Sequence, residues 1–306
     1  MIILGAGLSG CLAGALNKDA EIFEAISNDT THKAVLRFRS PEISDAIGIP
    51  FKKVKVYKYI WYEDKFVPLS PRMMNLYSHK VSNTFSARSI VNLDPAIRWI
   101  APDDLLDILK EQCEGRIGYS VPLNRTFIKD CQQTLQPIIS TVPLYVMADL
   151  FDLYDGDMTH KFTDIYINQF NIRNCDVYQT IYYPDPELGV YRATISGDTL
   201  IIESTDIMTG KEGASFQAVW KSFGLRESNT TQTLTDHLQR NGKIMPISER
   251  IRRKLIFDLT VNHGIYSLGR FATWRHILMD DVYKDIHVIK SLINKDAYEH
   301  KLEDSK

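Results

Sequence analysis

Short apolar runs flank one helical segment at the start of the chain. Residues 1–4 are all apolar and predict a buried strand. Residues 8–16 predict a helix, and residues 20–24 predict a second strand. Two strands joined by one helix predict a βαβ unit with parallel strands, whose crossover is normally right-handed.

The pattern changes in the middle of the chain. Residues 33–89 are irregular and rich in aromatics, and only 54–61 partly alternates polar and apolar positions, so we expect one strand there. Further on, turn residues at 184–186 and 196–198 separate runs typical of strands. Together these runs predict a mainly antiparallel sheet over residues 163–169, 177–183, 190–195 and 199–203.

The remaining periodic segments complete an α/β fold. Helices are expected at 102–113, 216–223, 248–259 and 279–292, and short strands at 116–121, 136–141 and 265–268. Because βα segments flank the antiparallel region, the order predicts a Rossmann-like domain with a parallel sheet, interrupted by a substrate domain with a mainly antiparallel sheet and helices. The expected boundaries are 1–35, 100–150 and 240–300 for the first domain, and 36–99 and 151–239 for the second.

Composition is that of a soluble globular protein. The 306 residues are 44% hydrophobic and 24% charged, and the net charge of −2 gives no global attraction to nucleic acid or membrane. No run of about twenty apolar residues is present. The apolar start lacks a basic region and is interrupted by Gly5 and Gly7. These features predict a cytoplasmic protein, and they leave its oligomeric state open.

The four cysteines form no recognisable pattern. Cys11, Cys113, Cys131 and Cys175 are scattered, without a CxxC pair. That spacing predicts neither a zinc site nor a disulfide framework. We therefore expect reduced thiols and no metal.

The first predicted turn carries a dinucleotide-binding fingerprint. Residues 5–10, Gly-Ala-Gly-Leu-Ser-Gly, fit G-x-G-x-x-G between a strand and a helix. Gly5 permits the tight turn, Gly7 lets backbone approach a pyrophosphate, and Gly10 lets helix and strand pack closely. The helix start at Leu8 and Ser9 offers N–H groups and a positive dipole end to phosphates.

An acidic residue completes the fingerprint. Glu24 ends the second predicted strand, nineteen residues after Gly5, where a carboxylate accepts hydrogen bonds from ribose hydroxyls. Glu21 is the competing acid but precedes that strand. A lone glycine motif is weak evidence, whereas strand, helix, second strand and acid in the expected order favour dinucleotide binding.

A second motif near the C-terminus points to FAD. Residues 265–270, Ile-Tyr-Ser-Leu-Gly-Arg, read as a strand ending in Gly-Arg, and residues 271–282 follow as Phe-Ala-Thr-Trp-Arg-His-Ile-Leu-Met-Asp-Asp-Val. This stretch resembles the second FAD-contacting motif of the amine-oxidase-like flavoproteins, and among them UDP-galactopyranose mutase. The matching positions are Gly269, Arg270, Arg275, Met279, Asp280 and Val282, with Trp274 in place of a tyrosine.

The resemblance implies non-covalent FAD. Gly269 would let backbone approach the cofactor, and Arg270 would neutralise a phosphate. Met279 and Asp280 would open a helix whose N-terminus faces the flavin. By the same resemblance, Val121 would contact adenine through its backbone. No second G-x-G-x-x-G is present, so the sequence predicts no separate NAD(P)H domain.

The resemblance also implies the chemistry. The leading interpretation is an FAD-dependent oxidoreductase that oxidises a C–N bond of an amine or amino-acid-type substrate. Its catalytic candidates are Arg192, as a substrate-anion arginine, together with Tyr191 and Trp274. One alternative is a sugar-nucleotide isomerase like the mutase, although the His-x-Phe-His-Thr stretch of that family is absent. The other is a non-catalytic flavin-binding protein.

A narrower resemblance concerns nucleic acid. The compact size and the run over 265–275 look like flavoproteins carried by bacteriophages, some of which trim amino-acid adducts on hypermodified thymidine in DNA. That resemblance implies a base-linked amine substrate and a location in the host cytoplasm. It also implies phosphate contacts from a basic set of residues, which an ordinary solvated strand face equally explains. The set is Lys52, Lys53, Lys55, Lys58 and Arg72.

Overall fold

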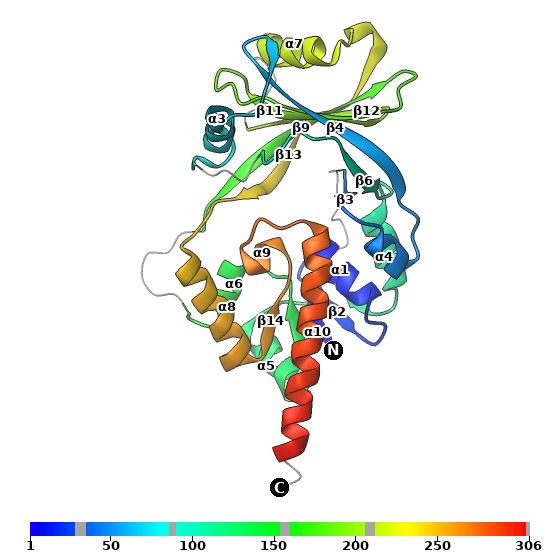
Figure 1. Ribbon diagram of the computed structural model, residues 1–306. Coiled ribbons are helices and arrows are strands. Elements are labelled where there is room, and N and C mark those ends of the chain that lie inside the picture. The colour runs from blue at the N-terminus through cyan, green and yellow to red at the C-terminus, as the bar shows by residue number, and fades with distance from the viewer. Residues whose placement is uncertain (28–34, 86–89, 154–159, 206–211, 304–306) are drawn as a thin grey trace. The chain divides into compact units, whose positions relative to one another are not determined.

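The chain folds into two units. The structure, a computed structural model, describes residues 1–27, 35–85, 90–153, 160–205 and 212–303. Unit 1 comprises Met1–Lys52, Trp99–His160 and Pro246–Lys306, and unit 2 comprises Lys53–Arg98 and Lys161–Met245 (Figure 1).

A parallel sheet forms the centre of unit 1. Its strand order is β14-β8-β1-β2-β7, and every neighbouring pair is parallel. This arrangement confirms the predicted Rossmann-like sheet and places strands from the two ends of the chain on either side of β8. The strands are β1 (Ile2–Leu4), β2 (Glu21–Phe23), β7 (Ile117–Gly118), β8 (Ile138–Ser140) and β14 (Ile265–Ser267).

Helices cover both faces of this sheet. Ile22 belongs to the same buried cluster as Leu12 of α1 and Ile286 of α10. Its neighbour Phe23 points to the opposite face and packs edge-to-face on Phe127 of α5, with ring centroids 5.1 Å apart. Unit 1 contains α1 (Leu8–Ala15), α4 (Leu105–Gln112), α5 (Arg125–Gln133), α6 (Leu144–Leu150), α8 (Glu249–His263), α9 (Arg270–Thr273) and α10 (Met279–Glu303).

Unit 1 takes more of the chain than the sequence predicts. Its first segment ends at Lys52 rather than at residue 35, because β3 (Arg37–Phe38) and α2 (Glu42–Ile47) bury Phe38, Ile43 and Ile47 in the unit 1 core. β3 pairs with the end of β6 (Ala96–Ile100). The middle segment likewise runs to His160, and the last begins at Pro246.

A mixed sheet forms the centre of unit 2. The strand order is β13-β9-β12-β11-β10-β4, and β5 pairs with β4. Only β4 and β10 are parallel among these pairs, which confirms the mainly antiparallel prediction. The strands are β4 (Lys52–Tyr62), β5 (Lys65–Val67), β9 (Phe162–Ile172), β10 (Val177–Tyr182), β11 (Val190–Gly197), β12 (Thr199–Ser204) and β13 (Thr230–Ile244).

Two helices pack on opposite faces of the unit 2 sheet. α7 (Glu212–Phe223) covers one face, where Val219 joins the buried cluster of Ile181 (Figure 1). The adjacent Tyr182 points the other way and meets Tyr77 of α3 (Pro71–Ser82), with ring centroids 5.3 Å apart. The same helix is held on the sheet by the half-buried Lys80, whose ammonium donates to three backbone carbonyl oxygens. These belong to Tyr183 (3.0 Å), Asp185 (2.6 Å) and Val190 (2.6 Å).

The expectation that residues 33–89 are irregular is wrong over α3. Ser70 caps this helix by accepting a hydrogen bond from the Met73 N–H (3.3 Å), and Pro71 occupies its first turn. Asn83 ends it in the left-handed conformation, at φ 50°. The 15-residue strand β13 was also not predicted; its ladder with β9 contains register shifts that break the regular alternation.

Three further properties bear on function. All four cysteines are free. Within the described ranges, no three His, Cys, Asp or Glu side chains are grouped so as to hold a metal ion. Over the same residues, no helix combines the length and the apolar character that crossing a membrane requires.

Candidate functional site

The turn after β1 is built around glycines that have different neighbours. Gly5 has φ +99°, and a Cβ there would lie 2.3 Å from Thr141 Oγ1. A Cβ on Gly10 would lie 1.9 Å from the Gly5 carbonyl oxygen. Gly7 differs, because a Cβ there would meet nothing within 4 Å. Gly5 and Gly10 are therefore required by packing, whereas Gly7 faces open space.

The open side of Gly7 is the start of α1. Gly7 occupies the N-cap position in an extended conformation, and no side chain caps the helix. The N–H groups of Leu8 and Ser9 lie in the first turn, where a helix provides no acceptor of its own, while the Cys11 N–H closes onto the Gly7 carbonyl at 2.9 Å. This end of the helix can therefore receive an anion through N–H groups and the helix dipole.

Glu24 lies directly beside the glycine turn. Its Oε2 accepts a hydrogen bond from the Ala6 N–H (2.7 Å), and its Oε1 accepts one from the Ile26 N–H (3.2 Å). The Glu24 carbonyl accepts from the Val121 N–H at 2.9 Å. Since the Val121 N–H already donates to Glu24, the Val121 carbonyl oxygen is the backbone group that could contact an adenine.

The C-terminal motif packs against the N-terminal one. Gly269 has φ +93°, and a Cβ there would lie 2.6 Å from Ser9 Oγ. The chain then turns into α9, where Arg270 is half-buried and Thr273 Oγ1 donates to the Gly269 carbonyl at 2.6 Å. At the C-terminal end of α9, Arg252 donates a hydrogen bond to the Thr273 carbonyl at 3.0 Å. The two motifs that the sequence separates by about the whole chain thus share one site.

The first turn of α10 contributes a buried carboxylate. Asp280 is 7% exposed, and its Oδ1 accepts from the Arg39 N–H at 2.8 Å. Its Oδ2 is buried without a hydrogen-bond partner, an arrangement that costs free energy unless a donor is supplied. Asp281, by contrast, is satisfied by the Arg39 guanidinium (2.9 Å) and by the Leu278 N–H (2.9 Å). Burial would raise the pKa of Asp281, but these donors hold it below its usual range.

Trp274 lies in an aromatic cluster of unit 1. It is 3% exposed and has a positive φ of 47°. Its ring meets His160 edge-to-face with centroids 4.4 Å apart, and Tyr145 lies 6.2 Å away. Burial lowers the pKa of His160, which favours a neutral imidazole at pH 7.

Tyr191 and Arg192 converge on a carboxylate that sequence reasoning missed. Glu203 lies opposite Arg192 in the β11–β12 ladder and pairs with its Nε and with its Nη2 (2.7 Å). The Tyr191 hydroxyl donates to Glu203 Oε1 at 2.9 Å. Successive strand residues normally face opposite sides, but a bulge between Val190 and Arg192 shifts the register here. The structure therefore joins Tyr191 to Arg192 in unit 2, whereas Trp274 belongs to unit 1.

Burial sets the protonation of this group. Burial would raise the pKa of the Glu203 carboxyl, but the Arg192 guanidinium, together with Lys243 and the Tyr191 hydroxyl, holds that pKa below its usual range. Burial and the nearby Glu203 charge raise the pKa of Tyr191 well above its usual value. The group is thus a neutral tyrosine with a carboxylate–guanidinium pair, so Arg192 already has a counter-ion before any substrate anion binds.

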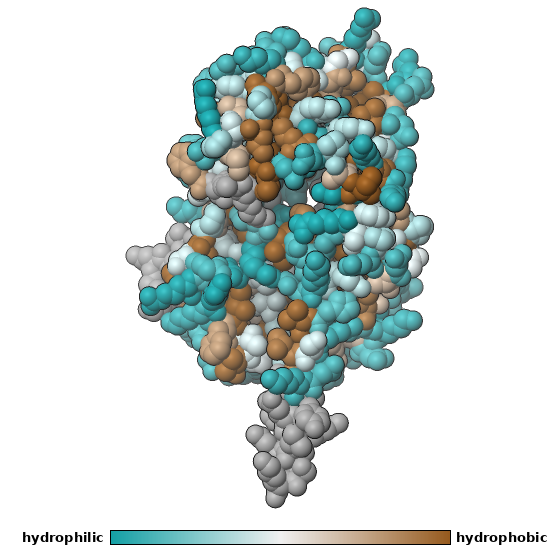
Figure 2. Space-filling view, in the orientation of Figure 1, coloured by the Kyte–Doolittle hydropathy of each residue, from teal (hydrophilic) through white to brown (hydrophobic). Residues whose placement is uncertain are grey.

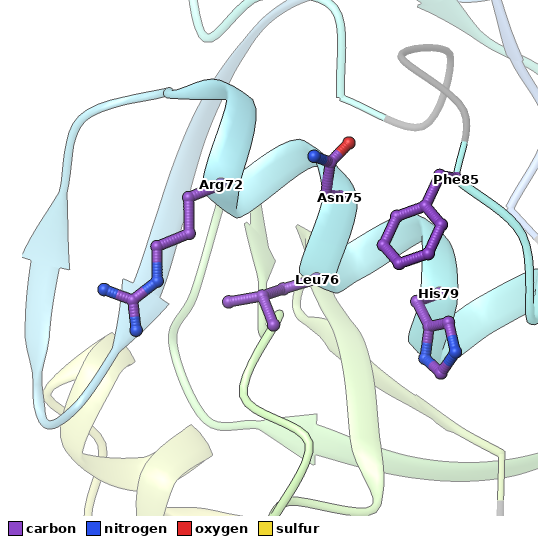
Figure 3. Close-up of a pocket in the computed structure, with 5 residues that line it drawn as sticks. All are labelled: Arg72, Asn75, Leu76, His79 and Phe85. Carbon is purple, nitrogen blue, oxygen red and sulfur yellow. The ribbon is translucent and has the colours of Figure 1, made fainter.

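A pocket of about 470 Å³ lies in unit 2, on α3. Most of its lining comes from one helical face, at spacings of three and four residues, and the ring of Phe85 lies beside the ring of His79 (Figure 3). The residues predicted to bind a cofactor do not line it. Its lining consists of Arg72, Asn75, Leu76, His79 and Phe85.

Comparison with known proteins shows the fold. No protein-family model matches the chain, and no curated protein matches its sequence. A structure of reduced UDP-galactopyranose mutase is similar, with a TM-score of 0.67 and 12% identity, covering 96% of this chain and 93% of that one. A structure assigned as a protoporphyrinogen oxidase from Exiguobacterium sp. 255-15 has a TM-score of 0.52 and 11% identity, covering 95% and 98%.

Proposed function

We propose that this chain is an FAD-dependent oxidoreductase that holds FAD non-covalently in unit 1 and oxidises a C–N bond in its substrate. The observation that carries the proposal is the contact between the glycine turn and the C-terminal motif at Ser9 and Gly269. A nicotinamide dehydrogenase would need the turn and Glu24, but it would leave the second motif unexplained.

The described residues fit an FAD molecule. Gly7 leaves room at the helix start where a pyrophosphate would lie, and Glu24 offers carboxylate oxygens for a ribose. Arg270 would neutralise phosphate charge. Asp280 presents a buried oxygen that lacks a donor, which a hydroxyl group of the cofactor would supply.

When bound, FAD supplies the redox chemistry, by accepting a hydride from carbon. The chain contributes binding and orientation. The N-terminus of α10, with Met279 in its first turn, presents a positive dipole end. In unit 2, Arg192 uses Nε and Nη2 for Glu203, and the remaining guanidinium N–H groups can receive a substrate carboxylate.

The runner-up is a redox-neutral sugar-nucleotide isomerase. It is supported by the fold likeness to the mutase, which is the stronger of the two structural similarities. An isomerase of that kind turns over only with reduced flavin and consumes no oxidant. Anaerobic reduction followed by addition of amines or UDP-sugars therefore separates the two functions. A non-catalytic flavin-binding protein would convert neither amines nor UDP-sugars.

Within the amine hypothesis, an amino-acid adduct on a modified thymidine in DNA is one substrate class. Its support is the resemblance of residues 265–275 to bacteriophage flavoproteins, together with an arginine suited to an adduct's carboxylate. Free amino acids and simple amines are the competing classes, and a screen that includes all three distinguishes them by which one bleaches the bound flavin.

The proposal predicts a yellow protein. The absorption spectrum of the purified chain should contain flavin bands. Heat denaturation should release the flavin into the supernatant, because the proposed binding is non-covalent. Chromatography of the supernatant should identify FAD. A colourless protein that remains so after incubation with FAD and removal of the excess would overturn the proposal.

Asp280→Asn should weaken FAD binding more than it weakens the fold. The asparagine keeps one oxygen for the Arg39 N–H but replaces the partnerless oxygen with an NH₂ group, which cannot accept. A lost hydrogen bond to a charged group costs about 1.5–3 kcal/mol, or roughly 10- to 150-fold in FAD affinity. Flavin fluorescence titration measures this change. Asp281→Asn is the control, since its carboxylate already has protein partners; equal effects at both positions would contradict the assignment of Asp280.

A further inference from the structure

One strand of unit 2 presents lysines and tyrosines in a single exposed row. In β4, Val54, Val56 and Ile60 are buried, while the alternate positions 53, 55, 57 and 59 are exposed. Alternate residues of a strand lie on one face, roughly 6.6 Å apart. We call Lys53, Lys55, Tyr57 and Tyr59, together with Phe66 of the adjacent β5, the Lys–Tyr face.

The rings of this face are exposed and contact neighbouring side chains. Tyr57, Tyr59 and Phe66 are 41%, 39% and 50% exposed. Phe66 lies 5.4 Å from Tyr59 and packs edge-to-face on the buried Trp61 at 4.9 Å, measured between ring centroids. The Lys55 ammonium lies 5.4 Å from the centre of the Tyr57 ring. The face therefore offers exposed aromatic surfaces beside positive charge.

Charge is unevenly divided between the two units. Unit 2 has 16 lysines and arginines against 13 aspartates and glutamates, whereas unit 1 has 20 against 25. The excess in unit 2 comes from residues 53–98, with eight basic and three acidic side chains. The net charge of −2 thus conceals a basic segment that contains the Lys–Tyr face.

The structure also sorts the basic residues that the sequence groups together. Lys58 falls between the exposed positions, and its ammonium donates to Asn92 Oδ1 at 2.8 Å. Arg72 donates to the Tyr62 hydroxyl at 3.1 Å and lies over that ring. Lys53 and Lys55 lie in the same exposed row of β4 as Tyr57 and Tyr59.

We propose that the Lys–Tyr face binds single-stranded nucleic acid. Bases stack on Tyr57, Tyr59 and Phe66, and phosphates lie against Lys53 and Lys55. Exposed rings on a sheet next to cationic side chains are suited to binding unpaired bases. Every base type has a flat face that can stack on such a ring. A duplex hides those faces and would engage the lysines alone. The inference does not rest on the flavin chemistry, because none of the proposed FAD contacts belongs to this face.

Fluorescence anisotropy tests the proposal. Labelled oligo-dT and a duplex of matched length are titrated with the purified protein at several salt concentrations. The single strand should bind more tightly than the duplex. Tyr57→Ala with Tyr59→Ala should weaken single-strand binding by at least roughly tenfold, because stacking is worth about 1–3 kcal/mol per base, and should leave the salt slope unchanged. Lys53→Gln with Lys55→Gln should reduce the log–log salt slope by about 1.4, at about 0.7 for each phosphate contact.

Matched controls come from unit 1. Lys129 is exposed, Phe257 is 62% exposed, and Lys129→Gln and Phe257→Ala should bind the single strand as the unaltered chain does. Equal affinity for duplex and single strand, tyrosine variants that bind normally, or capture only by vesicles of anionic lipid would each overturn the proposal. FAD content measured on the same samples reports on the flavin proposal separately, so the failure of one is distinguishable from the failure of the other.

Discussion

Gly7→Ala is expected to lower FAD affinity by roughly 5- to 150-fold while leaving the fold intact. Gly7 has φ −75° and ψ −177°, which alanine adopts readily, and an added methyl group meets no protein atom within 4 Å. The methyl group would instead enter the space proposed for the pyrophosphate. Crowding of that kind costs about 1–3 kcal/mol, which sets the expected range.

Gly10→Ala is the contrasting variant. Its methyl group would lie 1.9 Å from the Gly5 carbonyl oxygen, which is backbone and cannot rotate away. We expect a loss of at least about 3 kcal/mol in the free energy of unfolding, because helix and strand must separate. The cofactor would then be lost as a consequence of the damaged fold.

Two measurements distinguish these variants. Urea unfolding of the FAD-free protein reports the fold, and flavin fluorescence titration reports affinity. Gly213→Ala serves as the control, since Gly213 is also without close neighbours but belongs to α7 in unit 2. If Gly7→Ala binds FAD as the unaltered chain does, the pyrophosphate does not approach the backbone at this glycine.

Local patterns predicted both nucleotide motifs but could not predict their contact. Each motif is a short strand, a glycine turn and a helix, which can be identified within a few residues. Ser9 lies against Gly269 because β14 joins the same sheet as β1 with β8 between them. Strand order depends on packing over the whole chain, so a local pattern does not specify it.

The partner of Arg192 could have been found from the sequence. The turn at 196–198 pairs Ser196 with Thr199, and counting back along that hairpin places Arg192 opposite Glu203. Tyr191 is different, because it reaches the same carboxylate only through a bulge, which a two-residue period excludes. Likewise, nothing in the sequence distinguishes the partnerless oxygen of Asp280 from the satisfied carboxylate of Asp281.

The second large effect is expected at Glu203. Its side chain is 11% exposed and receives hydrogen bonds from Arg192 and Tyr191. Glu203→Gln leaves the guanidinium without its counter-ion and turns an NH₂ group toward N–H donors. Breaking a buried ion pair costs about 3–5 kcal/mol, but a third of the Arg192 side chain is exposed and water compensates in part, so we expect about 2 kcal/mol at pH 7.

The pH dependence gives this prediction a sign. Because the pKa of Glu203 is lower in the folded chain than in the unfolded one, its stabilising contribution is present above about pH 4.3 and is lost as pH falls below that value. The difference in unfolding free energy between the unaltered chain and Glu203→Gln should therefore have its largest value at pH 7. It should become smaller as the pH falls below about 4.3.

An exposed ion pair in the same unit supplies the control. Asp64 pairs with Lys221 at 2.9 Å, with side chains 68% and 57% exposed, so Asp64→Asn should change stability by less than about 1 kcal/mol. Urea unfolding of the three proteins at pH 7 and in acid measures both effects. A Glu203→Gln variant as stable as Asp64→Asn would mean that the pair is not needed to hold Tyr191 and Arg192.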